Sequence, residues 1–443
     1  MSLSAANSSM IPLASTKAIE DTLGSATSTI RAKRWLSPAN RYRLDTIMRV
    51  EADRQSGTIK RGHLAQYIAV STLLHCTDGW SYLGRSLQAL ISGDSKSAIH
   101  LAYYAELRAA MSILACEGIG VMNTRHFIVD AANSVRELPN PKGTHNFVWD
   151  CISWWANDVR SGPYLANLVR PGGQSLETWL APLGGSTIIS AHAQHWFLQW
   201  GMDLMLMGDD QRARNEASYR PSGMTGRAEP LLKDALAFVI DLWSALETSH
   251  SAGFDEIDRY ILRLSLEKAF LGRTGLNPRL HRKRFEAYIR PCVAQHAWSQ
   301  ASQDAWFDFL RRKTAREDSK LFHYSQLSPA STKHAELAVI SRACLLLRIA
   351  STATQRVFER AGIAKADLEF WRDQVGVHRG FWGLSGPPTP LTDLWADIRD
   401  LIADLRLFGA TKTTNHHQFT MAHSTALTSI GSCERVALWT MAG

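Results

Sequence analysis

Two short runs of basic side chains are the residues best suited to chemistry with an anionic partner. Arg282, Lys283 and Arg284 form the first run, and Arg311, Arg312 and Lys313 form the second. Arg presents a planar fork of donors and Lys a compact charge, so both neutralise phosphates without reading a base sequence. These six residues are candidate nucleic-acid contacts. The alternatives are a solvated helix face and a docking surface for an acidic protein.

The net charge of the chain is concentrated around such runs. The 443 residues include 36 Arg and 13 Lys, and the formal net charge is +8. Residues 273–320 carry a net charge of +6 and residues 31–61 another +6, so the remaining residues sum to about −4. Two local surpluses on an otherwise acidic chain favour an anionic partner, with RNA or another nucleic acid as the leading class.

Other kinds of site find little support in the spacing of residues. His192 and His195 share a predicted helix face, but Asp203 and Asp209 lie eight or more residues beyond them. We therefore expect hydrogen-bonded core histidines and no metal. The six cysteines lie at least 35 residues apart, which excludes a CxxC motif and favours a reducing, cytoplasmic compartment. Neither a Gly-rich phosphate loop nor a Gly-x-Ser-x-Gly elbow occurs, and no cofactor is expected.

The elements that position these residues are predicted to be helices. Apolar residues recur at intervals of three and four along most of the chain, whereas period-two runs are scarce, so the fold is predicted to be all-α. The longest stretch without charge, residues 178–202, contains Pro, Gly and His, so we expect no membrane span. The predicted helices are 62–76, 94–116, 186–207, 229–247, 254–270, 298–312, 334–360 and one that follows Thr389.

The predicted organisation is two helical-bundle halves. Residues 1–30, rich in Ser, Ala and Thr, are predicted to be a flexible N-terminal arm, followed by an N-terminal helical domain over 31–211. Residues 212–230 contain two Pro and two Gly and are the predicted linker. A C-terminal helical domain over 231–410 and an irregular or partly disordered tail over 411–443 complete the chain.

One helical segment carries a family resemblance. The run HLAYYAELRAAMSILACEGI, from His100 to Ile119, resembles the early long helix of HEPN-type bacterial helical domains and is similar to helical proteins of the YaaC family. The shared features are the Ala-Tyr-Tyr-Ala run, the small residues on one face and the closing Gly-Ile. At an offset of 234, His100, Arg108 and Ala109 fall on His334, Arg342 and Ala343, so the two halves are a candidate diverged repeat.

The resemblance implies metal-independent RNA cleavage by an Arg and a His. Four to six residues lie between the two in the sequence. The His would help to deprotonate the ribose hydroxyl and the Arg would stabilise charge on the phosphate, usually across a dimer seam. Chance placement of 36 Arg and 16 His predicts about 3.9 such pairs, so local context has to decide. The chain contains Arg290/His296, Arg316/His323 and Arg372/His378.

Context favours Arg372 and His378 as the catalytic candidates. Pro291 follows Arg290 directly, and Arg316 lies in a polar run, whereas Asp373 follows Arg372 as in many family members. The alternative for this pair is an ordinary ion pair or helix-end contact. The resulting hypothesis is a HEPN-like RNA-binding protein, with ribonuclease activity as a toxin or defence effector. A non-catalytic helical scaffold, as a homodimer or bound to a protein or nucleic acid, is the alternative.

Overall fold

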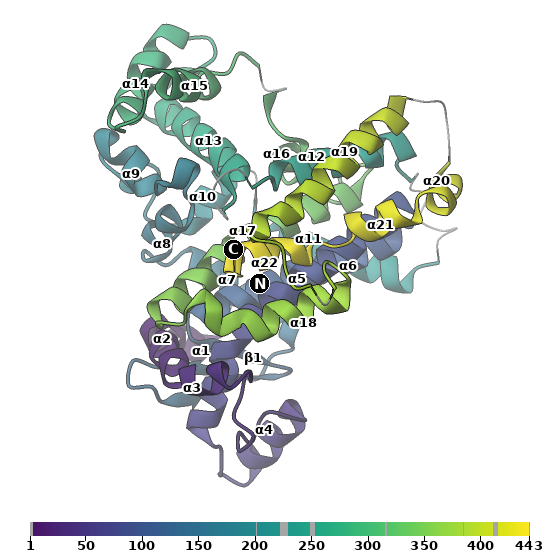
Figure 1. Ribbon diagram of the computed structural model, residues 1–443. Helices are drawn as coiled ribbons and strands as arrows, with labels where there is room; N and C mark the ends of the chain where they lie inside the picture. Colours follow the sequence, from purple (N-terminus) through teal and green to yellow (C-terminus); the bar gives the residue numbers. More distant parts are fainter. Residues whose placement is uncertain are drawn as a thin grey trace.

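The computed structural model describes residues 3–200, 202–221, 229–248, 253–314, 317–383, 385–410 and 415–442. These residues are mostly helical, with one small antiparallel sheet, and the predicted all-α class is confirmed in this sense (Figure 1).

Three long helices form the centre of the core. They are α5 (Arg61–Ile91), α6 (Ser95–Cys116) and α17 (Ala335–Arg360), and each packs against the other two. A Cβ atom at Gly79 of α5 would lie 2.5 Å from Leu347 Cδ2, so a larger residue there would displace the Leu347 side chain where α5 meets α17. Among the described helices, α17 alone is long and apolar enough to cross a membrane by composition. The most apolar 18-residue stretch of α17 is 94% buried inside the protein, so its apolar side chains form part of the core.

The sheet follows α6 directly and was not predicted. Strands β1 (Ile119–Met122), β2 (Arg125–Val129) and β3 (Val135–Glu137) pair in chain order, with Ile119 opposite Ile128. Each strand has only three to five residues. Such short strands give too few alternations to produce a period-two pattern.

The prediction that residues 1–30 form a flexible N-terminal arm is wrong for residues 5–30, which are largely helical. These residues form α1 (Ala5–Met10), α2 (Thr16–Ser25) and α3 (Thr27–Arg31). The Ser4 and Ser15 side chains cap α1 and α2, and Ile19 and Leu23 are fully buried. The backbone N–H of Ser15 donates to the carbonyl of Val129 at 2.9 Å, which ties the segment to β2. Ser and Thr therefore act here as helix caps and not as marks of disorder.

The two predicted halves share one core. Helix α17 belongs to the predicted C-terminal domain, yet it packs on α5 and α6 of the predicted N-terminal domain. The predicted linker begins inside α11 (Leu206–Tyr219), which packs on α6, and its residues 222–228 lie outside the described residues. The tail forms α20 (His416–Ala422), α21 (Ser424–Ile430) and α22 (Glu434–Ala442), and α22 is buried against α5 and α17.

The two charge surpluses lie at opposite ends of the molecule in Figure 1. The segment 31–61 includes α4, whereas the segment of the second surplus, 273–320, includes α14 and α15, at the outer end of the lobe that α8, α9, α10 and α13 build (Figure 1). The remaining helices are α4 (Thr46–Gln55), α7 (Thr144–Ala156), α8 (Ser161–Leu168), α9 (Leu176–Leu180), α10 (Ala193–Gln199), α12 (Leu232–Ala245), α13 (Asp255–Thr274), α14 (Arg282–Ala294), α15 (Gln300–Leu310), α16 (Lys320–Tyr324), α18 (Glu369–Arg379) and α19 (Leu394–Ala410).

Candidate nucleic-acid interface

The first basic run occupies the first turn of α14. Lys283 and Arg284 are exposed and Arg282 is half-buried, and none of the three forms an ion pair with a described residue. The Nε of Arg282 is buried without a hydrogen-bond partner among the described residues. The N-terminus of a helix is the positive end of its dipole, where each cation costs roughly 0.3–1 kcal/mol. The three basic side chains therefore do not stabilise α14. A bound anion would offset their unfavourable interaction with the helix dipole.

A groove of about 550 Å³ lies between α14 and α15. The Cζ atoms of Arg290 and Arg311 lie 4.9 and 5.4 Å from the centroid of the Phe307 ring, and all three residues line the groove. Arg311 is paired with Glu286 at 3.3 Å and Asp308 at 2.6 Å, whereas Arg290 has no ion pair with a described residue. Proteins that bind single-stranded nucleic acid often place an aromatic ring beside arginines in this way.

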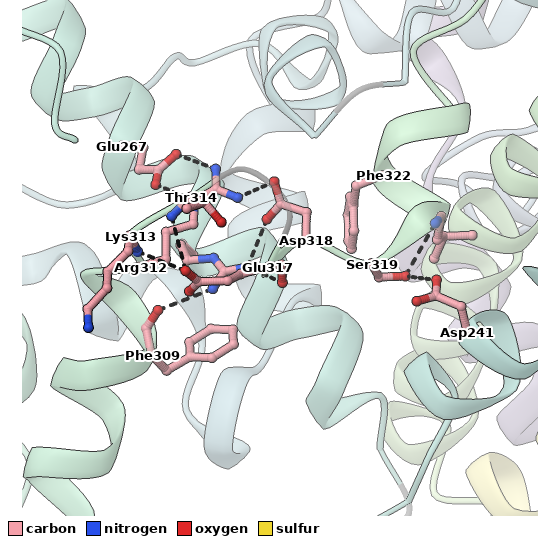
Figure 2. Close-up of polar contacts among 12 residues, drawn as sticks. Asp241, Glu267, Phe309, Arg312, Lys313, Thr314, Glu317, Asp318, Ser319 and Phe322 are labelled. Carbon is pink, nitrogen blue, oxygen red and sulfur yellow. Dashed lines mark hydrogen bonds and ion pairs between the residues drawn. The ribbon is translucent and has the colours of Figure 1, made fainter. Parts of the chain in front are cut away.

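The second basic run does not form one surface. Arg312 is buried, with 4% of its side chain exposed, and its Nε and Nη2 donate to the two carboxylate oxygens of Glu267 at 2.7 and 2.6 Å. Asp318 forms a further ion pair with Arg312 (Figure 2). The prediction that Arg312 contacts nucleic acid is therefore wrong, because two carboxylates from other elements already hold its guanidinium. Lys313 beside it is exposed.

Arg263 of α13 belongs to the same buried network. Its side chain is 2% exposed, and it donates to the carbonyl oxygens of Phe309 and Glu317 and to Asp318 Oδ1 at 3.2, 3.0 and 2.8 Å. Burial and the neighbouring Arg312 lower the pKa of Arg263. These contacts fix the end of α15 to α13. They hold the candidate interface in place and occupy the guanidinium groups of Arg263 and Arg312.

Arg372 and His378 lie at opposite ends of α18. Arg372 is half-buried and its Nε donates to Asp373 Oδ1 at 2.9 Å, with Glu369 at 3.9 Å from Nη1. His378 is exposed. Six helical positions separate two side chains by about 120° around the helix and about 9 Å along its axis. A single chain therefore does not bring Arg372 and His378 together, and the Arg takes part in an ordinary ion pair.

Of the other two Arg/His pairs, only Arg290/His296 lies wholly within the described residues. His296 is buried and stacks on Trp298 with ring centroids 4.3 Å apart, and burial lowers the pKa of His296. Its partner Arg290 lies on α14, which continues through Pro291. Arg316 of the third pair lies outside the described residues.

The histidines His192 and His195 are not core residues. The predicted helix 186–207 is interrupted, because α10 begins only at Ala193, and His195 is exposed. The Nδ1 of His195 lies 2.7 Å from Ser190 Oγ. Within the described part of the chain, no group of three or more His, Cys, Asp or Glu side chains could hold a metal ion.

Comparison with protein-family models, with curated proteins and with solved structures gives no match for this chain. The resemblance of residues 100–119 to HEPN domains therefore stays a prediction.

Proposed function

We propose that this protein binds single-stranded RNA through the surface formed by α14 and α15. The observation that carries the proposal is the unpaired run Arg282, Lys283 and Arg284 at the positive end of α14, the helix whose Arg290 lines the groove together with Phe307. The three cations would neutralise phosphates. Phe307 and Arg290 would hold a base by stacking.

The distribution of charge around this surface supports the proposal. Residues 276–314 contain eight Lys and Arg and three Asp and Glu, and only Arg312 of the eight bases is buried in ion pairs. We assign the protein to the cytoplasm, which is supported by six buried and unpaired cysteine thiols.

Replacing the run with Ala, as Arg282→Ala, Lys283→Ala and Arg284→Ala together, is expected to weaken binding of a single-stranded RNA about tenfold or more near physiological salt. The melting temperature should stay the same or rise, because the change removes cations from a helix N-terminus. Fluorescence anisotropy with a labelled RNA and thermal unfolding measure the two effects.

The matched control removes three exposed charges elsewhere, as Lys233→Ala, Lys333→Ala and Arg406→Ala. This variant changes the net charge equally and should keep most of the RNA affinity. An equal loss of RNA affinity in both variants would show that RNA binding depends only on the net charge of the protein. An unchanged affinity in the α14 variant would favour the alternative, a scaffold that docks an acidic protein.

Cleavage of RNA is a separate activity that the same samples test. Arg372 and His378 could act together only at a seam between two copies, since one chain holds them apart. Metal-independent cleavage that disappears in His378→Ala would add ribonuclease activity to the proposal. RNA that stays intact with the wild-type chain limits the function to binding.

A further inference from the structure

A second pocket, of about 610 Å³, shares no lining residue with the groove between α14 and α15. It opens where α17 faces the loop between α8 and α9 and the start of α13. The lining side chains of α17 recur at helical spacing and form one polar stripe on a helix that is otherwise almost entirely buried. The stripe consists of Arg348, Thr352, Gln355, Arg356, Glu359 and Arg360.

Arg348 lines the buried side of this pocket and has an unused donor. Its Nε and Nη2 donate to Asp258 at 2.7 and 2.6 Å, and Nη2 also donates to the carbonyl of Leu168 at 2.9 Å. The residue is 1% exposed, yet its Nη1 has no hydrogen-bond partner among the described residues. A buried polar group without a partner costs about 1–3 kcal/mol, and more when it is charged, so an acceptor is expected at this position.

Arg356 is a second cation without a direct partner. It is half-buried and forms no hydrogen bond or ion pair with a described residue. Burial lowers the pKa of Arg356, and the nearby Arg360 and Arg170 lower it further. Arg360 is paired with Glu20 at 3.4 Å, and Glu20 also favours the charged form of Arg356. Arg356 and Arg360 thus share the carboxylate of Glu20, and Arg170 adds a further positive charge. A doubly charged anion would relieve the repulsion among these three arginines.

Two acidic side chains at the pocket, Asp258 and Glu359, already have hydrogen-bond partners. Both oxygens of Asp258 bond to Arg348, and one also accepts from the backbone N–H of Arg170 at 2.6 Å. Glu359 accepts from Gln355 Nε2 at 2.9 Å. Glu359 and Asp255 lie at the lining, where carboxylates can accept hydrogen bonds from hydroxyl groups of a ligand.

We propose that this pocket binds a small phosphate ester that carries hydroxyl groups, of the size of a mononucleotide. The phosphate lies against Arg356, Arg360 and Arg170, and Nη1 of Arg348 donates to the ligand. The volume falls within the range of about 300–1,000 Å³ that is usual for small-molecule sites. An inorganic phosphate would leave most of this space empty. The site shares no residue with the α14 and α15 surface, so it does not rest on RNA binding.

The test is calorimetric titration of the full chain with AMP, CMP, glucose 6-phosphate and inorganic phosphate at one ionic strength. We expect at least one ester to bind, and to bind more tightly than inorganic phosphate. The variant Arg356→Gln should weaken that binding about 10- to 100-fold, as for loss of a charge-assisted hydrogen bond. Its melting temperature without ligand should not fall, because the change removes a repelled cation.

The control variant is Arg399→Gln, which removes an exposed Arg on α19, with 69% of its side chain accessible. It should bind the esters as the wild type does, and so should the triple Ala variant of α14. Failure of all four probes to bind would overturn the proposal. It would also be overturned if inorganic phosphate bound as tightly as the esters, or if Arg356→Gln left the affinity unchanged.

Discussion

Replacing Asp210 with Asn is expected to lower the free energy of unfolding by about 3–5 kcal/mol. Asp210 of α11 and Arg342 of α17 have no exposed surface, and the two oxygens of Asp210 accept from Arg342 Nε and Nη2 at 2.7 and 2.5 Å. The remaining donor, Nη1, bonds to the carbonyl oxygens of Ser325 and Leu327 at 2.9 and 2.8 Å. Asn would leave the buried guanidinium without a compensating charge.

The control for Asp210→Asn is Glu106→Gln, which changes a second buried carboxyl group beside Arg342. Glu106 is fully buried on α6 with one carboxyl oxygen 3.8 Å from Arg342 Nε. Burial and the nearby Asp210 raise the pKa of Glu106 well above its usual value. These surroundings favour the protonated form of Glu106, and Gln has almost the same shape as a protonated Glu. We expect little loss of stability from Glu106→Gln at pH 5.

The pH dependence of this pair of variants follows from the raised pKa of Glu106. The unfolded chain releases the proton of Glu106 near its usual pKa, whereas the raised pKa makes the folded chain hold it to higher pH, so wild-type stability falls as pH rises between the two pKa values. Glu106→Gln lacks this loss and should be more stable than the wild type at pH 8. Urea unfolding at pH 5 and pH 8 measures both effects. Equal destabilisation by Asp210→Asn and Glu106→Gln would contradict this assignment of charges.

The second large effect concerns Arg312. Its replacement with Met is expected to lower the free energy of unfolding by about 3 kcal/mol, because the largely buried carboxylates of Glu267 and Asp318 lose their partner. The matched variant Arg311→Met removes a half-exposed Arg with surface ion pairs and should cost at most about 1 kcal/mol. Denaturant unfolding compares the two. A similar cost for both would mean that Arg312 is not the structural member of its run.

Local signals in the sequence were sufficient for several of the long helices. The segment 334–360 corresponds to α17, Ala335–Arg360, and the Asp94 side chain accepts from the N–H of Ser97 at 3.0 Å at the start of α6 as its position predicts. Apolar period and caps are properties of neighbouring residues, so they can be recognised without the fold. The cap of α2 by Ser15 was missed because the segment is also rich in small residues that are typical of disorder.

The basic residues of the candidate interface could be predicted from the sequence only where no acidic side chain from a distant part of the chain pairs with them. The run at 282–284 stays available because no described acidic side chain pairs with it. Arg312 could not be recognised as buried, since Glu267 lies 45 residues away in the chain. Asp210 and Arg342 are separated by 132 residues. The pocket beside α17 draws on four separate segments, and nothing local in any of them indicates that they meet.

The salt dependence of RNA binding tests the proposed function most directly. Each phosphate contacted by a cation adds about 0.7 to the slope of log K against log salt for a single strand. The wild type should therefore bind less tightly as salt rises, and the Ala variant of Arg282, Lys283 and Arg284 should show a slope smaller by about 2. The control variant of Lys233, Lys333 and Arg406 should keep the wild-type slope. Identical slopes for the wild type and the α14 variant would contradict RNA binding at this surface.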